Sequence, residues 1–169
     1  MRYNKIRKMD ISNGPGVRVS IFMQGCSFNC KNCFNKETHD FCGGKEFDDS
    51  TIERVLELCD NENIEGLSIL GGEPMHPTNI EGTTKLAKAF KEKYPNKSVW
   101  SWSGYSFDND LKDKEVVKYL DVLVDGRYQD ELSNPTLKWR GSENQRVIDV
   151  KASLKKNKVI LHEENGVLV

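Results

Sequence analysis

The stretch VRVSIFMQGCSFNCKNC, residues 17–33, decides how the rest of this chain is interpreted. Its first half, residues 17–24, is rich in β-branched and large apolar side chains, which is typical of a buried strand. Glycine and proline at residues 14–16 mark a turn before it. Its second half carries three cysteines in the spacing CxxxCxxC. We therefore expect a first strand that leads directly into a loop with three thiols.

Beyond this stretch, apolar runs alternate with helical patterns, which predicts βαβ units around a mostly parallel sheet. Further strands are expected at residues 66–70, 98–103 and 122–124. A capping-box pattern formed by Ser50 and Glu53 predicts the start of the first helix. Two more helices are expected at about 80–94 and around 113–120. The fold class is therefore α/β, and a partial (βα) barrel is the expected architecture.

The size and charge of the chain narrow the possible functions. Its 169 residues fit a single domain, 1–169, whose end is expected to form short strands within 146–169, at 146–150 and 159–162. The formal net charge is -1, with 25 basic and 26 acidic residues, which disfavours nucleic acid as a partner. No apolar run is long enough for a signal peptide or a membrane span, so we expect a cytoplasmic protein without a membrane partner.

The connection between the first strand and the first helix is unusually long. It covers residues 25–49, whereas such loops usually take about 2 to 6 residues, and long loops in compact domains are often functional. In parallel sheets, ligands bind at the carboxyl ends of the strands. The cysteine loop therefore lies where a site is expected.

Cys26, Cys30 and Cys33 are suited to hold an inorganic centre. Short loops between them would strain disulfides, and the total of five cysteines is odd. A cubane cluster takes four cysteine ligands when all of its irons are bound by protein. Three cysteines therefore predict a [4Fe-4S] cluster with one open iron. Zinc is the alternative, with Cys42 or His39 as a fourth ligand, although a second cysteine pair is missing.

A second motif follows the strand expected at 66–70. Gly71 and Gly72 let the chain curl at the strand end, and Glu73 can form a charge-assisted hydrogen bond to an ammonium group. With CxxxCxxC before it, this Gly-Gly-Glu-Pro segment resembles the radical S-adenosylmethionine superfamily. The resemblance implies that the open iron chelates the methionine moiety and that an electron from the cluster cleaves S-adenosylmethionine. Methionine and a 5'-deoxyadenosyl radical are the implied products.

Within that superfamily the chain resembles the activating proteins of anaerobic, glycyl-radical ribonucleoside-triphosphate reductases. The matching stretches lie at residues 13–18, 25–38, 71–77, 100–105, 121–128 and 139–146. The resemblance implies an activase that removes a hydrogen atom from a glycine of the large reductase subunit. It also implies a low-potential, flavodoxin-like electron donor. A radical enzyme acting on another protein or a small molecule, and a zinc-stabilised interaction module, are the alternative functions.

The resemblance also assigns residues to the site. Cys26, Cys30 and Cys33 are implied as the cluster ligands. The adenine is expected to contact Asn32, Cys33 and Phe34, and the methionine end Gly71, Gly72 and Glu73. The chain departs from the wider superfamily in having Asn32 instead of an aromatic residue before the third cysteine.

Four further features of the sequence have an expected place in the fold. Trp100 and Trp102 alternate along a strand and are expected to pack in the sheet. Cys59 lies on the apolar face of the first helix and is expected in the core. Asp125 is expected in a turn, and its position at the carboxyl end of a strand also keeps a cofactor role open. The resemblance alone implies that the segment 140–146 lies on a surface that positions the partner or substrate.

Overall fold

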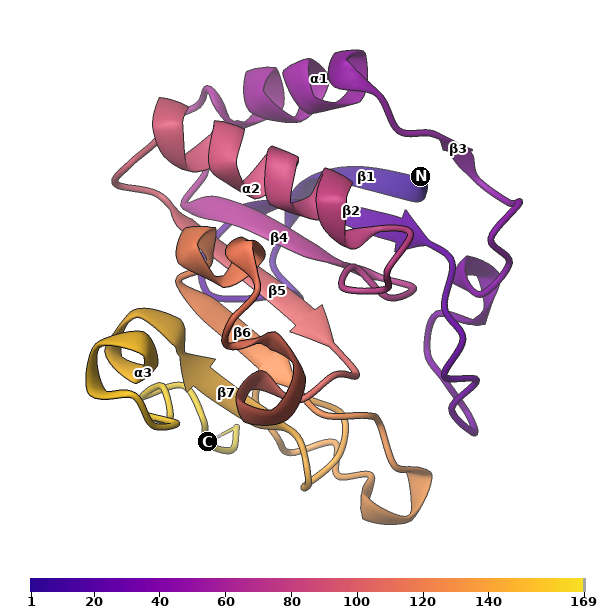
Figure 1. Ribbon diagram of the computed structural model, residues 1–169, viewed down its shortest axis with the longest axis vertical. Helices are drawn as coiled ribbons and strands as arrows, with labels where there is room; N and C mark the ends of the chain where they lie inside the picture. Colours follow the sequence, from indigo (N-terminus) through magenta and orange to yellow (C-terminus); the bar gives the residue numbers. More distant parts are fainter. Residues whose placement is uncertain (169) are drawn as a thin grey trace.

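The computed structural model describes residues 1–168 and shows one open, seven-stranded sheet (Figure 1). The strand order is β3-β1-β2-β4-β5-β6-β7. The strands are β1 (Arg2–Asp10), β2 (Arg18–Gln24), β3 (Lys45–Glu46), β4 (Gly66–Gly71), β5 (Ser98–Ser103), β6 (Val122–Asp125) and β7 (Arg146–Asp149). The central strands β2, β4, β5 and β6 are parallel, whereas the outer pairings are antiparallel. The α/β class is confirmed.

The register of the parallel strands brings their carboxyl ends to one edge of the sheet. Met23 at the end of β2 pairs with Gly71 at the end of β4, and Ser103 of β5 pairs with Asp125 of β6. The loops that follow these strands therefore emerge side by side. This edge is where an α/β sheet offers its ligand site.

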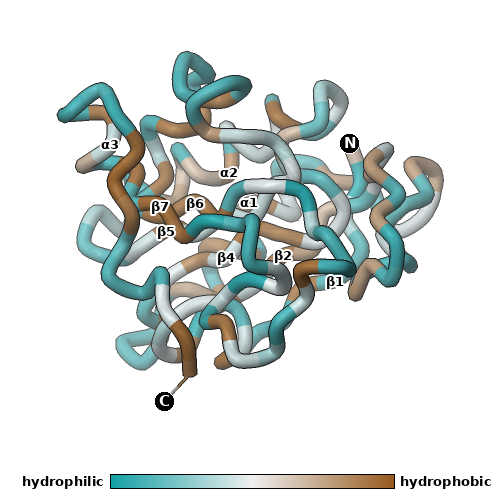
Figure 2. The backbone as a smooth tube through the Cα atoms, turned by 90° about the horizontal axis from the view of Figure 1, so that it is seen from below, coloured by the Kyte–Doolittle hydropathy of each residue, from teal (hydrophilic) through white to brown (hydrophobic). Residues whose placement is uncertain are grey.

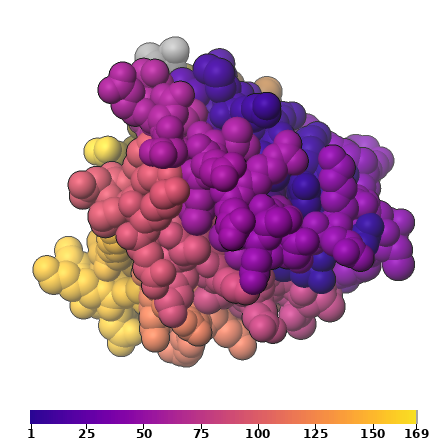
Figure 3. Space-filling view, turned by 90° about the horizontal axis from the view of Figure 1, so that it is seen from above, coloured from indigo at the N-terminus to yellow at the C-terminus, as the bar shows by residue number. Residues whose placement is uncertain are grey.

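Helices cover only one face of the sheet. The helices α1 (Asp49–Cys59) and α2 (Ile80–Lys93) pack there with a short 3-10 helix, Glu115–Tyr119 (Figure 1). Seen from above, these helices form the outer face, with the N-terminal and C-terminal parts of the chain at opposite sides (Figure 3). In Figure 2 the strands β5, β6 and β7 carry apolar segments in the interior, and many of the surrounding loops are hydrophilic.

The opposite face carries a second, smaller core. Side chains alternate between the faces along a strand. Val99 and Leu123 therefore belong to the core under the helices, whereas Trp100, Val122, Val124 and Val147 form a cluster on the other face. Trp102 and Trp139 pack against this cluster. Loops, instead of helices, cover this side, which leaves room for a cavity.

The strands expected at 17–24, 66–70, 98–103 and 122–124 and the helix expected at about 80–94 are confirmed. The strand β1 was not expected, because charged residues alternate with apolar ones along it. In the structure only Tyr3 and Asp10 of this strand are buried. Pairing with β2 stabilises it. Within the described chain, no helix is both long and apolar enough to cross a membrane.

Three expectations were wrong in detail. The capping box of α1 is made by Asp48 and Thr51, not by Ser50 and Glu53, because the Asp48 side chain accepts the Thr51 N–H at 3.0 Å. Within the expected helix at 113–120, only Glu115–Tyr119 is helical, and it forms a 3-10 helix instead of an α-helix.

The C-terminal region also differs from the expected pair of strands. Only β7 forms, and α3 (Val150–Lys156) follows it, since the Asp149 side chain caps the Ala152 N–H at 2.9 Å. Leu161 makes an isolated bridge to Ile148 instead of a strand. Val169 lies outside the described residues.

Arg18 is fully buried at the amino ends of the central strands. Its guanidinium donates to the Ser68 hydroxyl at 2.7 Å and to the carbonyls of Leu67 and Ser98, both at 3.0 Å. Burial lowers the pKa of Arg18 to about 10, so the group stays charged at neutral pH. One side chain thus connects β2, β4 and β5 through hydrogen bonds.

We predict that Arg18→Met lowers the free energy of unfolding by about 3 kcal/mol, because buried oxygen atoms lose a charged donor. Urea unfolding followed by circular dichroism measures this loss. The control is Arg54→Met, which removes an exposed arginine from α1. A loss no larger than that of the control would contradict the structural role of Arg18.

Candidate functional site

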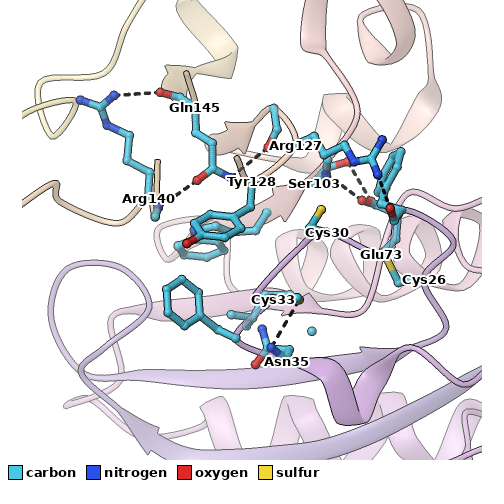
Figure 4. A pocket seen from close by; sticks show the side chains of 18 of the residues that line it. Cys26, Cys30, Cys33, Asn35, Glu73, Ser103, Arg127, Tyr128, Arg140 and Gln145 are labelled. Carbon is cyan, nitrogen blue, oxygen red and sulfur yellow. Dashed lines mark hydrogen bonds between the residues drawn. The ribbon is translucent and has the colours of Figure 1, made fainter. Parts of the chain in front are cut away.

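A cavity of about 720 Å³ lies at the carboxyl edge of the sheet (Figure 4). It brings together segments that are far apart in the sequence. Seven of the eight site residues expected from the sequence resemblance line it: Cys26, Cys30, Cys33, Phe34, Gly71, Gly72 and Glu73. The thiols and the Gly-Gly-Glu turn therefore share one cavity. Asn32 is the one expected residue that does not line the cavity.

The base of the cysteine loop is closed by its own backbone. The Gly25 N–H donates to the Thr38 carbonyl at 2.7 Å, and the Cys26 N–H donates to the His39 carbonyl at 3.1 Å. The buried Gln24 side chain donates to the carbonyl of Asp40 at 2.7 Å. The chain thus returns to the end of β2 after the last cysteine, and the three thiols project from a closed loop.

The Gly-Gly-Glu turn packs directly on the start of this loop. The Gly72 N–H donates to the Met23 carbonyl, and the Glu73 N–H donates to the Gly25 carbonyl, both at 2.9 Å. A Cβ atom on Gly72 would lie 2.6 Å from the Gly25 oxygen, and Gly71 adopts a φ of 107°. Glycine is therefore required at both positions, because a side chain would separate the two loops.

Asn79 joins the cysteine loop to the Gly-Gly-Glu turn, and the sequence did not indicate this role. It is almost fully buried, and its side-chain amide donates to the carbonyls of Gln24 at 3.1 Å and Glu73 at 3.0 Å. Both loops are thereby attached to the start of α2. The sequence offers no local signal for this role, since the partners lie far from Asn79 along the chain.

The three cysteines are free thiols that are partly exposed to the cavity. Burial is the main cause that raises the pKa of Cys26 and Cys33 above that of an ordinary thiol, and the neighbouring Cys30 raises both further. Residues 1–168 contain no group of three ligating side chains arranged around a single ion. A cubane cluster spaces its thiolates more widely than one ion does, and three soft donors beside one cavity fit it.

Glu73 is buried, and its carboxylate is used within the protein. It accepts hydrogen bonds from the Gly104 N–H at 2.7 Å, the Ser103 hydroxyl at 2.8 Å and the Met75 N–H at 2.9 Å. Burial raises the pKa of Glu73 to about 7, and these hydrogen bonds act in the opposite direction. Glu73 therefore joins the turn after β4 to the end of β5.

Asn32 does not line the cavity. Its side chain is exposed and donates to the Asp130 carboxylate at 3.0 Å. Cys42 is exposed and does not line the cavity, whereas His39 does. Cys59 is buried in the core as expected, and burial raises its pKa to about 12.

Of the two strand tryptophans, Trp100 is buried as expected and Trp102 faces the cavity. Asp125 is buried and accepts from Arg146 at 2.6 Å and from the Phe107 N–H at 2.7 Å. It lines a separate, smaller cavity instead of the main one. Its ion pair joins β6 to β7, and this pairing is a structural role.

Several lining residues were missed as individual contributors. Arg127, Tyr128 and Trp139 all face the cavity, and the rings of Phe34 and Tyr128 lie 5.3 Å apart. The sequence signal that could have identified Arg127 and Tyr128 is their position directly after the carboxyl end of β6. For Trp139 the signal is its place in the matched stretch 139–146. Arg140 and Gln145, both in the segment 140–146, also line the cavity (Figure 4).

Comparison with known proteins adds independent information. Residues 12–148 match the family model described as a 4Fe-4S single cluster domain. An anaerobic ribonucleoside-triphosphate reductase-activating protein of Enterobacteria phage T4 is 40% identical over 147 residues, which covers 87% of this chain and 93% of the relative.

Proteins with the same name from two bacteria give similar results. The one from Escherichia coli K12 is 36% identical over 150 residues, which covers 87% of this chain and 97% of the relative. The one from Pasteurella multocida is 35% identical over 150 residues, covering 86% and 95%. The chain therefore belongs to the family of anaerobic ribonucleoside-triphosphate reductase-activating proteins, within the 4Fe-4S single cluster domain family.

Proposed function

We propose that this chain is a radical S-adenosylmethionine activase for an anaerobic ribonucleoside-triphosphate reductase. It cleaves S-adenosylmethionine reductively and removes a hydrogen atom from a glycine of the large reductase subunit. One observation carries the proposal: the three-cysteine loop and the Gly-Gly-Glu turn line one cavity in a chain of the activating-protein family. A single domain of residues 1–169 performs this chemistry.

Cys26, Cys30 and Cys33 hold the [4Fe-4S] cluster through their thiolates. Three cysteine ligands leave one iron open for S-adenosylmethionine. When bound, the cluster supplies the electron for the reductive cleavage. The positive charge of the irons would lower the thiol pKa values that burial raises in the free protein. The 4Fe-4S family model favours this centre over the zinc alternative.

Residues of both loops bind the S-adenosylmethionine. Gly71, Gly72 and Glu73 receive the methionine end, because the glycines expose backbone at the strand end. The buried Glu73 carboxylate holds this turn through its three hydrogen bonds. Cys33, Phe34 and the backbone of Asn32 receive the adenine. The ring of Tyr128 beside Phe34 extends this aromatic wall.

The remaining cavity admits the glycine-bearing segment of the reductase. Trp102, Trp139 and Phe22 line it on the side of the sheet. Apolar walls exclude water, which protects a reactive radical. A low-potential, flavodoxin-like protein supplies the electron to the cluster, and free thiols at the site suit the reducing cytoplasm. Neither nucleic acid nor a membrane takes part.

We predict that replacing Cys26, Cys30 or Cys33 with alanine abolishes S-adenosylmethionine cleavage, because the cluster loses one of its three ligands. Anaerobic reconstitution, iron and sulfide analysis and chromatography of 5'-deoxyadenosine measure the effect. Cys42→Ala and Cys59→Ala are the controls. Cys59→Ala should reduce stability on the order of 1 kcal/mol and keep the chemistry. Loss of chemistry in either control would show that the ligands are misassigned.

The substrate is tested with the reductase itself. We expect the reconstituted protein, reduced anaerobically with S-adenosylmethionine, to generate a glycyl radical in the large subunit, detected by EPR spectroscopy. A reductase variant with alanine at the radical glycine is the matched control and should give no signal. Efficient S-adenosylmethionine cleavage without a glycyl radical would instead indicate another substrate, such as a different protein or a small molecule.

The raised pKa of Glu73 predicts that the free energy of unfolding of the metal-free protein depends on pH. Its pKa is raised from 4.5 to about 7, so between these values the folded protein keeps a proton that the unfolded chain has lost. Stability therefore falls as the pH rises through this range, by about 3 kcal/mol in total, at about 1.4 kcal/mol for each pKa unit.

The measurement is urea unfolding of the wild type and Glu73→Gln from about pH 5 to about pH 7.5. The variant should lose this part of the pH dependence, because its side chain does not titrate. Its absolute stability is a separate matter, since the amide cannot accept all three hydrogen bonds. Parallel stability curves for the two proteins would disprove the assignment.

A further inference from the structure

The cysteine loop is held by a second segment that lies about a hundred residues further along the chain. Residues 127–130, here called the clamp segment, follow the carboxyl end of β6. Arg127 donates to the Phe28 carbonyl and its guanidinium lies 5.4 Å from the centre of the Phe28 ring. These contacts fix the loop between its first and second cysteines.

Asp130 fixes the loop between its second and third cysteines. One of its carboxylate oxygens accepts from the Asn32 side chain at 3.0 Å and lies 3.6 Å from the Lys31 ammonium. The other accepts from the Tyr128 hydroxyl at 3.2 Å. Asn32 has a left-handed backbone, with a φ of 55°, which asparagine tolerates better than most residues. Asp130 therefore holds an unusual turn of the loop in place.

The clamp segment is itself supported by residues 140–146 further along the chain. The Asn144 side chain donates to the Arg127 carbonyl at 2.7 Å, and the Gln129 N–H donates to the Ser142 hydroxyl at 3.2 Å. Gly141 packs on the rings of Phe34 and Tyr128, where a Cβ atom would lie 3.1 Å from each. Three layers of chain are thus joined by hydrogen bonds and close packing.

We propose that Arg127 and Asp130 are positioning residues that hold the cysteine loop in the conformation that retains the cluster. This inference rests on the proposed function only for the identity of the bound group. It gives the segment 140–146 its role as the support of the clamp. Because Arg127 and Asp130 contact the cysteine loop between its thiols, their loss changes how the cluster is held.

The first test measures cluster release. Reconstituted wild type and Asp130→Ala are mixed anaerobically with excess EDTA, and the loss of cluster absorbance is followed. We expect release to be about tenfold faster in Asp130→Ala, the factor associated with one hydrogen bond to a charged group. Asp130→Asn keeps an acceptor oxygen and should restore part of the retention. Glu131→Gln, which removes the adjacent exposed charge, should behave as the wild type.

The second test does not require a cluster or the proposed reaction. In the metal-free protein, iodoacetamide should alkylate Cys30 and Cys33 several-fold faster in Asp130→Ala than in the wild type, as read by mass spectrometry. Cys42, which is exposed and outside the clamp contacts, is the internal control and should not change. Asn144→Asp, which removes the donor to Arg127, should have the same effect on the two thiols.

The EPR spectrum of the reduced cluster distinguishes positioning from general stability. Asp130→Ala should alter the g-values or linewidths, whereas Arg18→Met, a destabilising change far from the loop, should leave them unchanged. Equal melting temperatures of metal-free wild type and Asp130→Ala would show that the fold is intact. Wild-type rates of both cluster release and alkylation in Asp130→Ala would overturn the proposal, whatever the activity of the protein.

Discussion

The site depends on the close approach of two backbone segments at the ends of neighbouring parallel strands. The turn after β4 can donate hydrogen bonds to the end of β2 only because Gly71 and Gly72 carry no side chains. This contact sets where the cysteine loop begins, and Asn79 attaches both segments to α2. Without it, the thiols and the Gly-Gly-Glu turn would be two unrelated loops. The register of the sheet therefore determines how the two loops are placed around the cavity.

One face of the sheet carries the main hydrophobic core, and the other carries the cavity. On one face, helices bury an apolar core that supplies most of the hydrophobic stabilisation. On the other, a small cluster around Trp100 is covered by loops, so a cavity of about 720 Å³ remains between the sheet and those loops. Arg18 ties the central strands together on this loop-covered side. A short chain can thus combine a stable sheet with a large binding space.

The cysteine loop is supported from both sides. At its base, the Gly-Gly-Glu turn and the returning chain near Thr38 bond to residues 25 and 26. At its tip, the clamp segment holds Phe28 and Asn32 through Arg127 and Asp130. Left-handed turns inside the loop give it few conformational alternatives once both ends are held. This arrangement explains how a loop without a helix or long strand can present three thiols to one cavity.

The sequence alone determined the buried strands, the helix at α2 and the two motifs of the site, because these depend on local patterns of apolar residues, cysteine spacing and glycine. It did not reveal β1, whose partly exposed residues become a strand only by pairing with β2. It also gave no sign that the Asn32 side chain binds Asp130. Only the tertiary structure decided these features, since strand pairing and side-chain hydrogen bonds between separate segments leave no local periodicity that a sequence can show.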